Sequence, residues 1–157
     1  MATKTNAVRL VQQAGIPCRE AFYEFDEQDL SGVHAAQAIG MPEEQVFKTL
    51  VARGEKTGIN VFCIPVCCEL DLKKAAKAAG DKNMELVAVK ELLGQTGYIR
   101  GGCSPVGMKK HYPTFIDETC TLWDEIAVSA GARGHQMIVP PQPLADLVGA
   151  ELTDIIV

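Results

Sequence analysis

A predicted hairpin constrains the fold more than any other feature of the sequence. Residues 46–52 and 59–66 are rich in β-branched, aromatic and aliphatic side chains, and Gly54 and Gly58 lie between them. This pattern predicts two strands joined by a turn. Side chains alternate between the two faces of a strand, and in 46–52 both faces are mainly apolar apart from Lys48. Such a strand is typical of a sheet that is covered on both sides.

The rest of the chain is divided into short elements by glycine, proline and polar residues. Helices are predicted at 4–14, 31–39, 72–79, 90–93 and 143–148. Further strands are predicted at 19–25, 85–89, 114–117, 121–123, 126–129, 136–139 and 152–157. Strands often follow one another directly, which differs from the strict alternation of a doubly wound sheet. We therefore expect an α/β fold of α+β character, in which helices surround a mixed, barrel-like sheet.

Length and composition narrow the class further. A chain of 157 residues fits one domain, 1–157, and its 47% hydrophobic and 22% charged residues are ordinary for a globular protein. The longest apolar run, 59–68, has about half the length that a membrane-spanning helix needs. The polar start of the chain has no apolar signal segment, so we expect a cytoplasmic protein without membrane contact. A net charge of −5 argues against binding nucleic acid by bulk charge alone, and no DNA partner is expected.

Six cysteines would suggest a disulfide scaffold in a small secreted protein. They are Cys18, Cys63, Cys67, Cys68, Cys103 and Cys120. Without a signal peptide, they are interpreted as reduced and mostly buried side chains. No C-x-x-C pair is present, so no metal site is expected.

Lys48 is the first candidate functional residue, because it lies in the middle of an apolar strand. One interpretation is an edge strand from which the lysine extends to water. The other is a partly desolvated ammonium group at a cleft, where it could bind an anion or a developing oxyanion. The sequence leaves both open.

A glycine-rich loop at 101–107 is the second candidate. The adjacent Gly101 and Gly102 follow a predicted extended segment, and such a loop can bring backbone amides close to an oxyanion or a carbonyl group. The loop matches neither of the common glycine motifs for phosphate binding, so a nucleotide-binding protein is a weak third possibility for function. An ordinary turn is the alternative interpretation.

Lysines cluster on two segments in spite of the acidic total. Lys73 and Lys77 share one face of a predicted helix, and Lys109 and Lys110 follow the glycine loop. Such lysines usually form a solvated surface, but beside a binding site they could contact the phosphates of a polyanionic substrate.

Taken together and in this order, these motifs resemble the YbaK family of aminoacyl-tRNA editing proteins, the free-standing Cys-tRNA(Pro) deacylases. The motifs that carry the resemblance are VFKTL at 46–50, LKKAA at 72–76, TGY at 96–98, GGCSPVGMKK at 101–110, VSAG at 128–131, RG at 133–134, LVGAE at 147–151 and TDI at 153–155. The resemblance implies the fold of the editing domain inserted in some prolyl-tRNA synthetases. It also implies hydrolysis of cysteine mischarged onto proline tRNA, without metal or organic cofactor and in transient association with prolyl-tRNA synthetase.

The resemblance assigns roles to particular residues. Lys48 falls at the essential lysine of the family, and the implied substrate pocket contains Tyr23, Thr49, Gly101, Gly102 and Ser129. Lys73, Lys77, Lys109 and Lys110 become candidate tRNA contacts. The implied mechanism is assisted by the substrate, whose own thiolate attacks the ester while the protein supplies positioning and electrostatics.

Three positions depart from the pattern of the family. Relatives can carry an aromatic residue in place of Ser31, and some have an acidic residue near Gln136. Cys103 lies inside the glycine loop, where free amides could lower the pKa of its thiol.

Two alternatives to Cys-tRNA(Pro) hydrolysis remain. A related deacylase could prefer alanine or another small amino acid, since pocket walls set that choice. A non-catalytic module that binds tRNA or a synthetase could also keep the fold.

Overall fold

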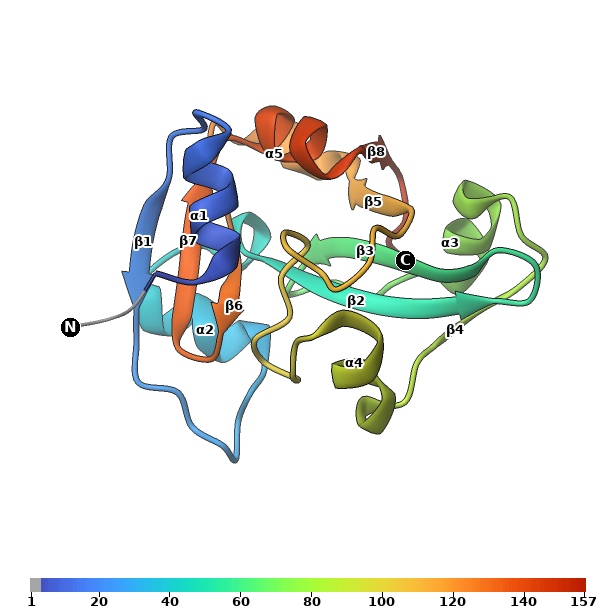
Figure 1. The fold of residues 1–157 in the computed structure, drawn as a ribbon, viewed down its shortest axis with the longest axis horizontal. Helices are drawn as coiled ribbons and strands as arrows, with labels where there is room; N and C mark the ends of the chain where they lie inside the picture. The colour runs from blue at the N-terminus through green and yellow to red at the C-terminus, as the bar shows by residue number, and fades with distance from the viewer. Residues whose placement is uncertain (1–3) are drawn as a thin grey trace.

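Two β-sheets and five α-helices make up residues 4–157, the part of the chain that the computed structural model describes (Figure 1). The strands are β1 (Arg19–Phe22), β2 (Phe47–Gly54), β3 (Gly58–Pro65), β4 (Met84–Leu86), β5 (Thr114–Asp117), β6 (Ile126–Ala132), β7 (His135–Val139) and β8 (Ala150–Thr153). The helices are α1 (Asn6–Gln13), α2 (Gly32–Ile39), α3 (Leu72–Ala79), α4 (Val89–Thr96) and α5 (Pro141–Val148). None of these helices has the length and apolar character needed to cross a bilayer.

The larger sheet has the strand order β4-β2-β3-β5-β8. The predicted hairpin is confirmed, because β2 and β3 pair antiparallel along their full length. The sheet is mixed, since β3 pairs parallel with β5 and β5 pairs parallel with β8. The smaller sheet, β1-β7-β6, is antiparallel.

The two sheets do not close into a barrel, in contrast to the barrel-like form that was predicted. A parallel bridge between Val46 and Ala127, at the start of β2, joins them. Beyond that bridge the edge of β2 is open, because β4 pairs only with Ala52, Arg53 and Gly54. A closed barrel would need a strand along this edge, which instead borders a pocket.

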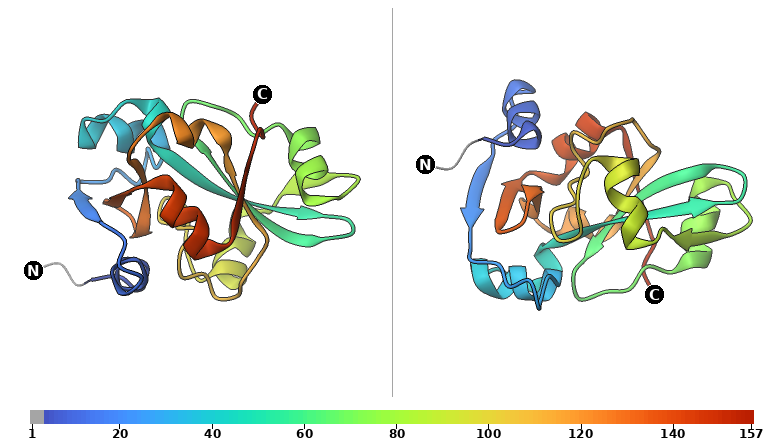
Figure 2. Two further views of the ribbon diagram at one scale, coloured as in Figure 1. Left: turned by 90° about the horizontal axis from the view of Figure 1, so that it is seen from above. Right: turned by 60° about the horizontal axis from the view of Figure 1, so that its bottom comes forward.

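Helices cover both faces of the hairpin, as its apolar pattern predicted (Figure 2). On one face, Ala75 and Ala76 of α3 pack against Phe62 and Ile64. On the other face, a larger core gathers side chains from α1, α5 and both sheets, including Phe47. A third cluster joins α2 to the smaller sheet.

Side-chain caps fix the starts of α2 and α3. Ser31 caps α2 by accepting a hydrogen bond from the His34 amide at 3.2 Å. Asp71 caps α3 by accepting bonds from the amides of Lys73 and Lys74, both at 3.0 Å. The predicted bounds of α3 are confirmed without change.

A buried carboxylate makes the predicted strand 121–123 wrong. Asp117, at the end of β5, accepts hydrogen bonds from the amide and hydroxyl of Thr119 and from the Ile155 amide. The first two bonds cap a 3-10 helix at Glu118–Leu122 in place of the strand. The third fixes the C-terminal segment over the sheet.

The turn of the hairpin is held by Asp81, which follows α3. Its carboxylate accepts bonds from the Lys56 amide at 3.0 Å and from the amide and hydroxyl of Thr57, both at 2.8 Å. Desolvation acts to raise the pKa of Asp81, but the bonds from Thr57, Lys82 and Lys56 outweigh it and lower the pKa well below its usual range.

Candidate active site

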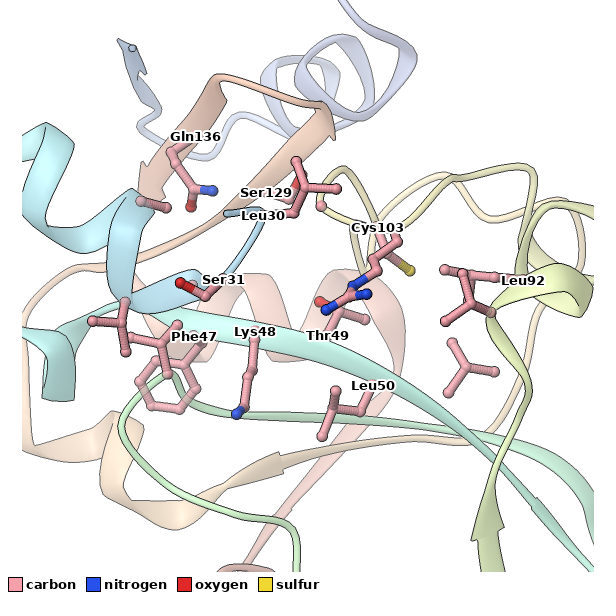
Figure 3. Close-up of a pocket in the computed structure, with 18 of the residues that line it drawn as sticks. Leu30, Ser31, Phe47, Lys48, Thr49, Leu50, Leu92, Cys103, Ser129 and Gln136 are labelled. Atoms are coloured by element: carbon pink, nitrogen blue, oxygen red, sulfur yellow. The ribbon is translucent and has the colours of Figure 1, made fainter. Parts of the chain in front are cut away.

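A pocket of about 460 Å³ lies along the open edge of β2 (Figure 3). Its walls come from β2, from the start of α2, from the facing strands β6 and β7, and from α4 with the glycine loop that follows it. Of the pocket residues that the resemblance implied, Tyr23, Lys48, Thr49, Gly101 and Ser129 line it. Residues that lie up to 106 positions apart in the chain therefore meet in one cavity.

The backbone of β2 contributes to this wall. Hydrogen bonds in an antiparallel pair involve alternate residues of each strand. The Val66 amide donates to the Val46 carbonyl at 2.8 Å, which assigns the even-numbered residues of β2 to the β3 side. The Val51 carbonyl accordingly accepts from Val87 on the opposite side, at 3.0 Å. The amide and carbonyl of Thr49 therefore face the pocket edge, where no strand of residues 4–157 pairs with them.

Lys48 combines both interpretations offered by the sequence, because it lies on an open edge and is nonetheless half-buried. Its ammonium group has no hydrogen bond or ion pair with any other residue that the structure describes. Figure 3 shows its side chain extending from β2 away from Ser129 and Gln136. It lies near Cys68, whose pKa is raised to about 11 chiefly by burial, with Lys48 acting in the opposite direction.

The amino terminus of α2 lies beside Lys48. Ser31, Gly32 and Val33 line the pocket, and a Cβ placed on Gly32 would lie 3.8 Å from the Cβ of Lys48. The first amides of a helix have no partners within the helix, and the helix dipole makes this end positive. An unpaired ammonium group and a helix amino terminus thus provide a local positive field, which suits a small anion.

The glycine loop forms a second wall. Gly101 lines the pocket with a φ of +87°, a conformation that L side chains rarely adopt. Gly102 does not line the pocket, and its amide donates to the Ile99 carbonyl at 2.9 Å to close a turn. A Cβ on Gly102 would approach the backbone nitrogen of Arg133 to 3.1 Å, so this glycine is needed for close packing.

The structure corrects the expectation for Cys103. This side chain lines the pocket but is 8% exposed, and burial raises the pKa of its thiol to about 12. The predicted lowering by nearby amides is wrong, because the thiol lies among buried groups and the loss of hydration dominates. Cys103 is therefore a neutral wall residue at ordinary pH.

Several pocket residues carry no motif in the sequence. Leu86, Val89 and Leu92 form an apolar end with β4 and α4, and Figure 3 shows Leu92 and Cys103 on the far side from Gln136. The exposed Arg100 also lines the pocket. The helix that supplies Leu92 was predicted as a single turn at 90–93, and its true length depends on tertiary packing.

The lysines proposed to contact tRNA lie outside this pocket. Lys73 and Lys77 are exposed on α3, while Lys109 and Lys110 are exposed beyond the glycine loop. Lys110 borders a second, smaller cavity of about 280 Å³. Across residues 4–157, no three His, Cys, Asp or Glu side chains are grouped so that they could hold a metal ion.

Solved structures share this fold. One, described as "a putative trans-editing enzyme for prolyl tRNA synthetase", has a TM-score of 0.80 and 27% identity and covers 99% of both chains. A second, of a hypothetical protein, has a TM-score of 0.85 at 21% identity and covers 95% of this chain and 97% of the other. The chain therefore has the fold of this putative trans-editing enzyme.

The family follows from the sequence comparisons. The family model described as an aminoacyl-tRNA editing domain matches residues 30–147. A relative from Enterococcus faecalis, named "Putative Cys-tRNA(Pro)/Cys-tRNA(Cys) deacylase EbsC", is 45% identical over 152 residues, which are 97% of this chain and 93% of the relative. The chain belongs to the aminoacyl-tRNA editing domain family. The resemblance inferred from the motifs and the predicted mixed α/β fold are both confirmed.

Proposed function

We propose that this protein is an aminoacyl-tRNA deacylase that removes cysteine from mischarged Cys-tRNA(Pro) in trans. The observation that carries the proposal is the pocket itself, which gathers Lys48, the free edge of β2 and Gly101 around one cavity. The family and the name of the Enterococcus faecalis relative support the substrate class. We take residues 1–157 as a single editing domain, which acts without metal or organic cofactor.

The polar groups of the pocket suit stabilisation of negative charge. The ester carbonyl would lie against the Gly101 backbone, whose amide would stabilise an oxyanion. Lys48 and the amino terminus of α2 would stabilise a thiolate or the 3′-end of the tRNA. These fixed groups act by positioning and electrostatics, and they need no change in protonation of the protein.

The attacking group is supplied by the substrate. Its thiolate sulfur bonds to the ester carbonyl carbon, the bond from that carbon to the ribose oxygen breaks, and the ribose oxygen takes up a proton. Water then opens the cyclic thioester to release cysteine. Possible protein nucleophiles fit less well, because the Cys103 thiol has a raised pKa and the Ser104 hydroxyl is buried and bonded to the Val106 amide. None of the three histidines lines the pocket described here.

The tRNA would extend from the pocket over the surface of the protein. Lys73, Lys77, Lys109 and Lys110 are exposed and available for phosphate contacts. Prolyl-tRNA synthetase is the proposed source of the mischarged tRNA, through a transient association.

Release of labelled amino acid from Cys-tRNA(Pro) and Ala-tRNA(Pro), with enzyme limiting and with enzyme in excess, tests the proposal. We expect repeated turnover of the cysteinyl ester and little loss of the alanyl ester, which has no thiol. Release of alanine at a rate comparable to that of cysteine would still identify a deacylase, but it would refute the thiol mechanism. Protection of both esters would instead identify a tRNA-binding module.

A further inference from the structure

Gln136 is a buried amide that neither the fold nor the proposed mechanism uses. It lies on β7, the central strand of the smaller sheet, and is 6% exposed. It lines the pocket, and Figure 3 shows its amide group pointing from β7 into the cavity. Its side-chain oxygen Oε1 is buried, and no residue that the structure describes donates a hydrogen bond to it.

Small neighbours leave room in front of this amide. In the register of the sheet, Gln136 is flanked by Ala21 on β1 and by Ser129 on β6. Two residues further along β7, Ile138 packs in the apolar cluster beneath α2. A methionine or leucine in place of Gln136 would extend that cluster, so packing alone does not account for an amide here.

A buried acceptor without a donor destabilises a protein, by about 1–3 kcal/mol for a typical group. Each such group in a native protein needs an explanation, and a bound ligand that supplies the missing donor is one. The ligand would have to supply N–H or O–H donors to this end of the pocket. Ser129 adds a second polar group there, because its Oγ accepts from the Gly131 amide at 3.1 Å and retains a further lone pair.

The charges of the pocket favour a cationic donor at this end. Lys48 makes the opposite side positive, since Figure 3 shows its side chain directed away from Gln136. The ester substrate carries one cationic donor group, its α-ammonium, which has three N–H bonds. Separation of that cation from Lys48 lowers their mutual repulsion, and a carbonyl oxygen is a suitable acceptor for it.

We propose that Gln136, through Oε1 and with the help of the Ser129 hydroxyl, binds the α-ammonium group of the aminoacyl ester. The inference rests on the proposed function and goes beyond it by assigning the amino group of the substrate to one end of the pocket. The ester carbonyl then lies toward Gly101. The terminal ribose and base extend toward the apolar end that contains Leu92.

The experiment compares two adenosine analogues that cannot be hydrolysed. In one, cysteine is joined to the 3′-position of adenosine by an amide bond; in the other, 3-mercaptopropionate, which lacks the α-amino group, takes its place. Calorimetry measures the dissociation constants of both for wild type, Gln136→Met and Gln142→Met. Gln142 is an exposed residue of α5 bonded to Asp146, and its variant is the matched control.

Wild type and Gln142→Met should bind the cysteinyl analogue at least about tenfold more tightly than the des-amino analogue. Gln136→Met should bind both with the affinity that wild type has for the des-amino analogue. Equal weakening of both analogues by Gln136→Met would indicate a structural role and overturn the proposal. Lack of discrimination by wild type, or no binding, would also overturn it.

Hydrolysis of Cys-tRNA(Pro) by the same samples is measured in parallel. Amine-dependent binding by a protein that does not hydrolyse this ester would refute the proposed function but retain the ammonium site. Hydrolysis of the ester without amine-dependent binding would support the proposed function but refute the ammonium site.

Discussion

Gly32 is required for space, and substituting it tests how the pocket wall is built. This first residue of α2 lacks a positive φ, so alanine is compatible with its backbone. A Cβ at this position, however, would lie 2.2 Å from Cγ1 and 2.8 Å from Cβ of Val66. Val66 is β-branched and 5% exposed, so it cannot move aside easily. We expect Gly32→Ala to lower the free energy of unfolding by about 1–3 kcal/mol, the usual cost of overpacking.

The contact between Gly32 and Val66 predicts a specific rescue. Val66→Ala alone should destabilise the protein by about 1–3 kcal/mol through the cavity it leaves. In the double variant, Gly32→Ala with Val66→Ala, the new methyl group at position 32 occupies that cavity. The loss of unfolding free energy should therefore be at least about 1 kcal/mol smaller than the sum of the losses in the two single variants. Urea unfolding followed by circular dichroism gives all the values needed.

Gly40→Ala is the matched control on the same helix. A Cβ there meets nothing within 4 Å, but its φ is +71°, so alanine is strained for a different reason. Its effect should add to that of Val66→Ala within about 0.5 kcal/mol. The steric account would be refuted if the effects of Gly32→Ala and Val66→Ala were also additive. It would equally be refuted if the Gly32→Ala variant were as stable as wild type.

Three further predictions concern titratable groups outside this contact. Asp117→Ala should lower the free energy of unfolding in urea by about 2–4 kcal/mol, because it leaves buried donors unpaired. Asp154→Ala breaks an exposed ion pair with Lys74 and should lower the free energy of unfolding by no more than about 1 kcal/mol. Similar losses for the two variants would contradict the structural role given to Asp117. The folded pKa of Asp81 is below its unfolded value of about 3.9, so its contribution is present above that pH and is lost as the pH falls further. Wild type should therefore lose stability relative to Asp81→Asn between about pH 5 and 2, and parallel curves would contradict this. Iodoacetamide at pH 8 should label the exposed Cys67 in the native protein, but should label Cys103 only after unfolding. The Cys103→Ser variant should hydrolyse the ester at a rate within a few fold of wild type. Labelling of Cys103 in the native protein, detected by peptide mass spectrometry, would contradict the raised pKa.

Local signals in the sequence predicted the elements that local chemistry decides. The hairpin follows from two apolar runs around a glycine turn, and it forms with β2 and β3 in full register. Ser31 and Asp71 are short polar residues before apolar stripes, and both cap their helices. The family motifs also indicated part of the pocket lining, because Lys48 and Gly101 each stand in a recognisable run.

What the sequence did not predict depends on contacts between distant residues. The open edge of β2 exists because the smaller sheet joins it only at the bridge between Val46 and Ala127. The 3-10 helix after β5 forms because Asp117 is buried where its carboxylate can accept three bonds. The environment of Cys103 and the unpaired oxygen of Gln136 are likewise properties of packing, and no local pattern indicates them.

The most direct test of the central claim is the rate at which Lys48→Met releases cysteine from Cys-tRNA(Pro). Methionine keeps an unbranched apolar side chain but removes the charge, and Lys82→Met, at an exposed position, is the matched control. We predict a loss of at least about a hundredfold for Lys48→Met, the usual effect of removing a group that stabilises developing charge. Its stability should change by no more than about 0.5 kcal/mol, and Lys82→Met should hydrolyse like wild type. A Lys48→Met variant with the wild-type rate would contradict the account.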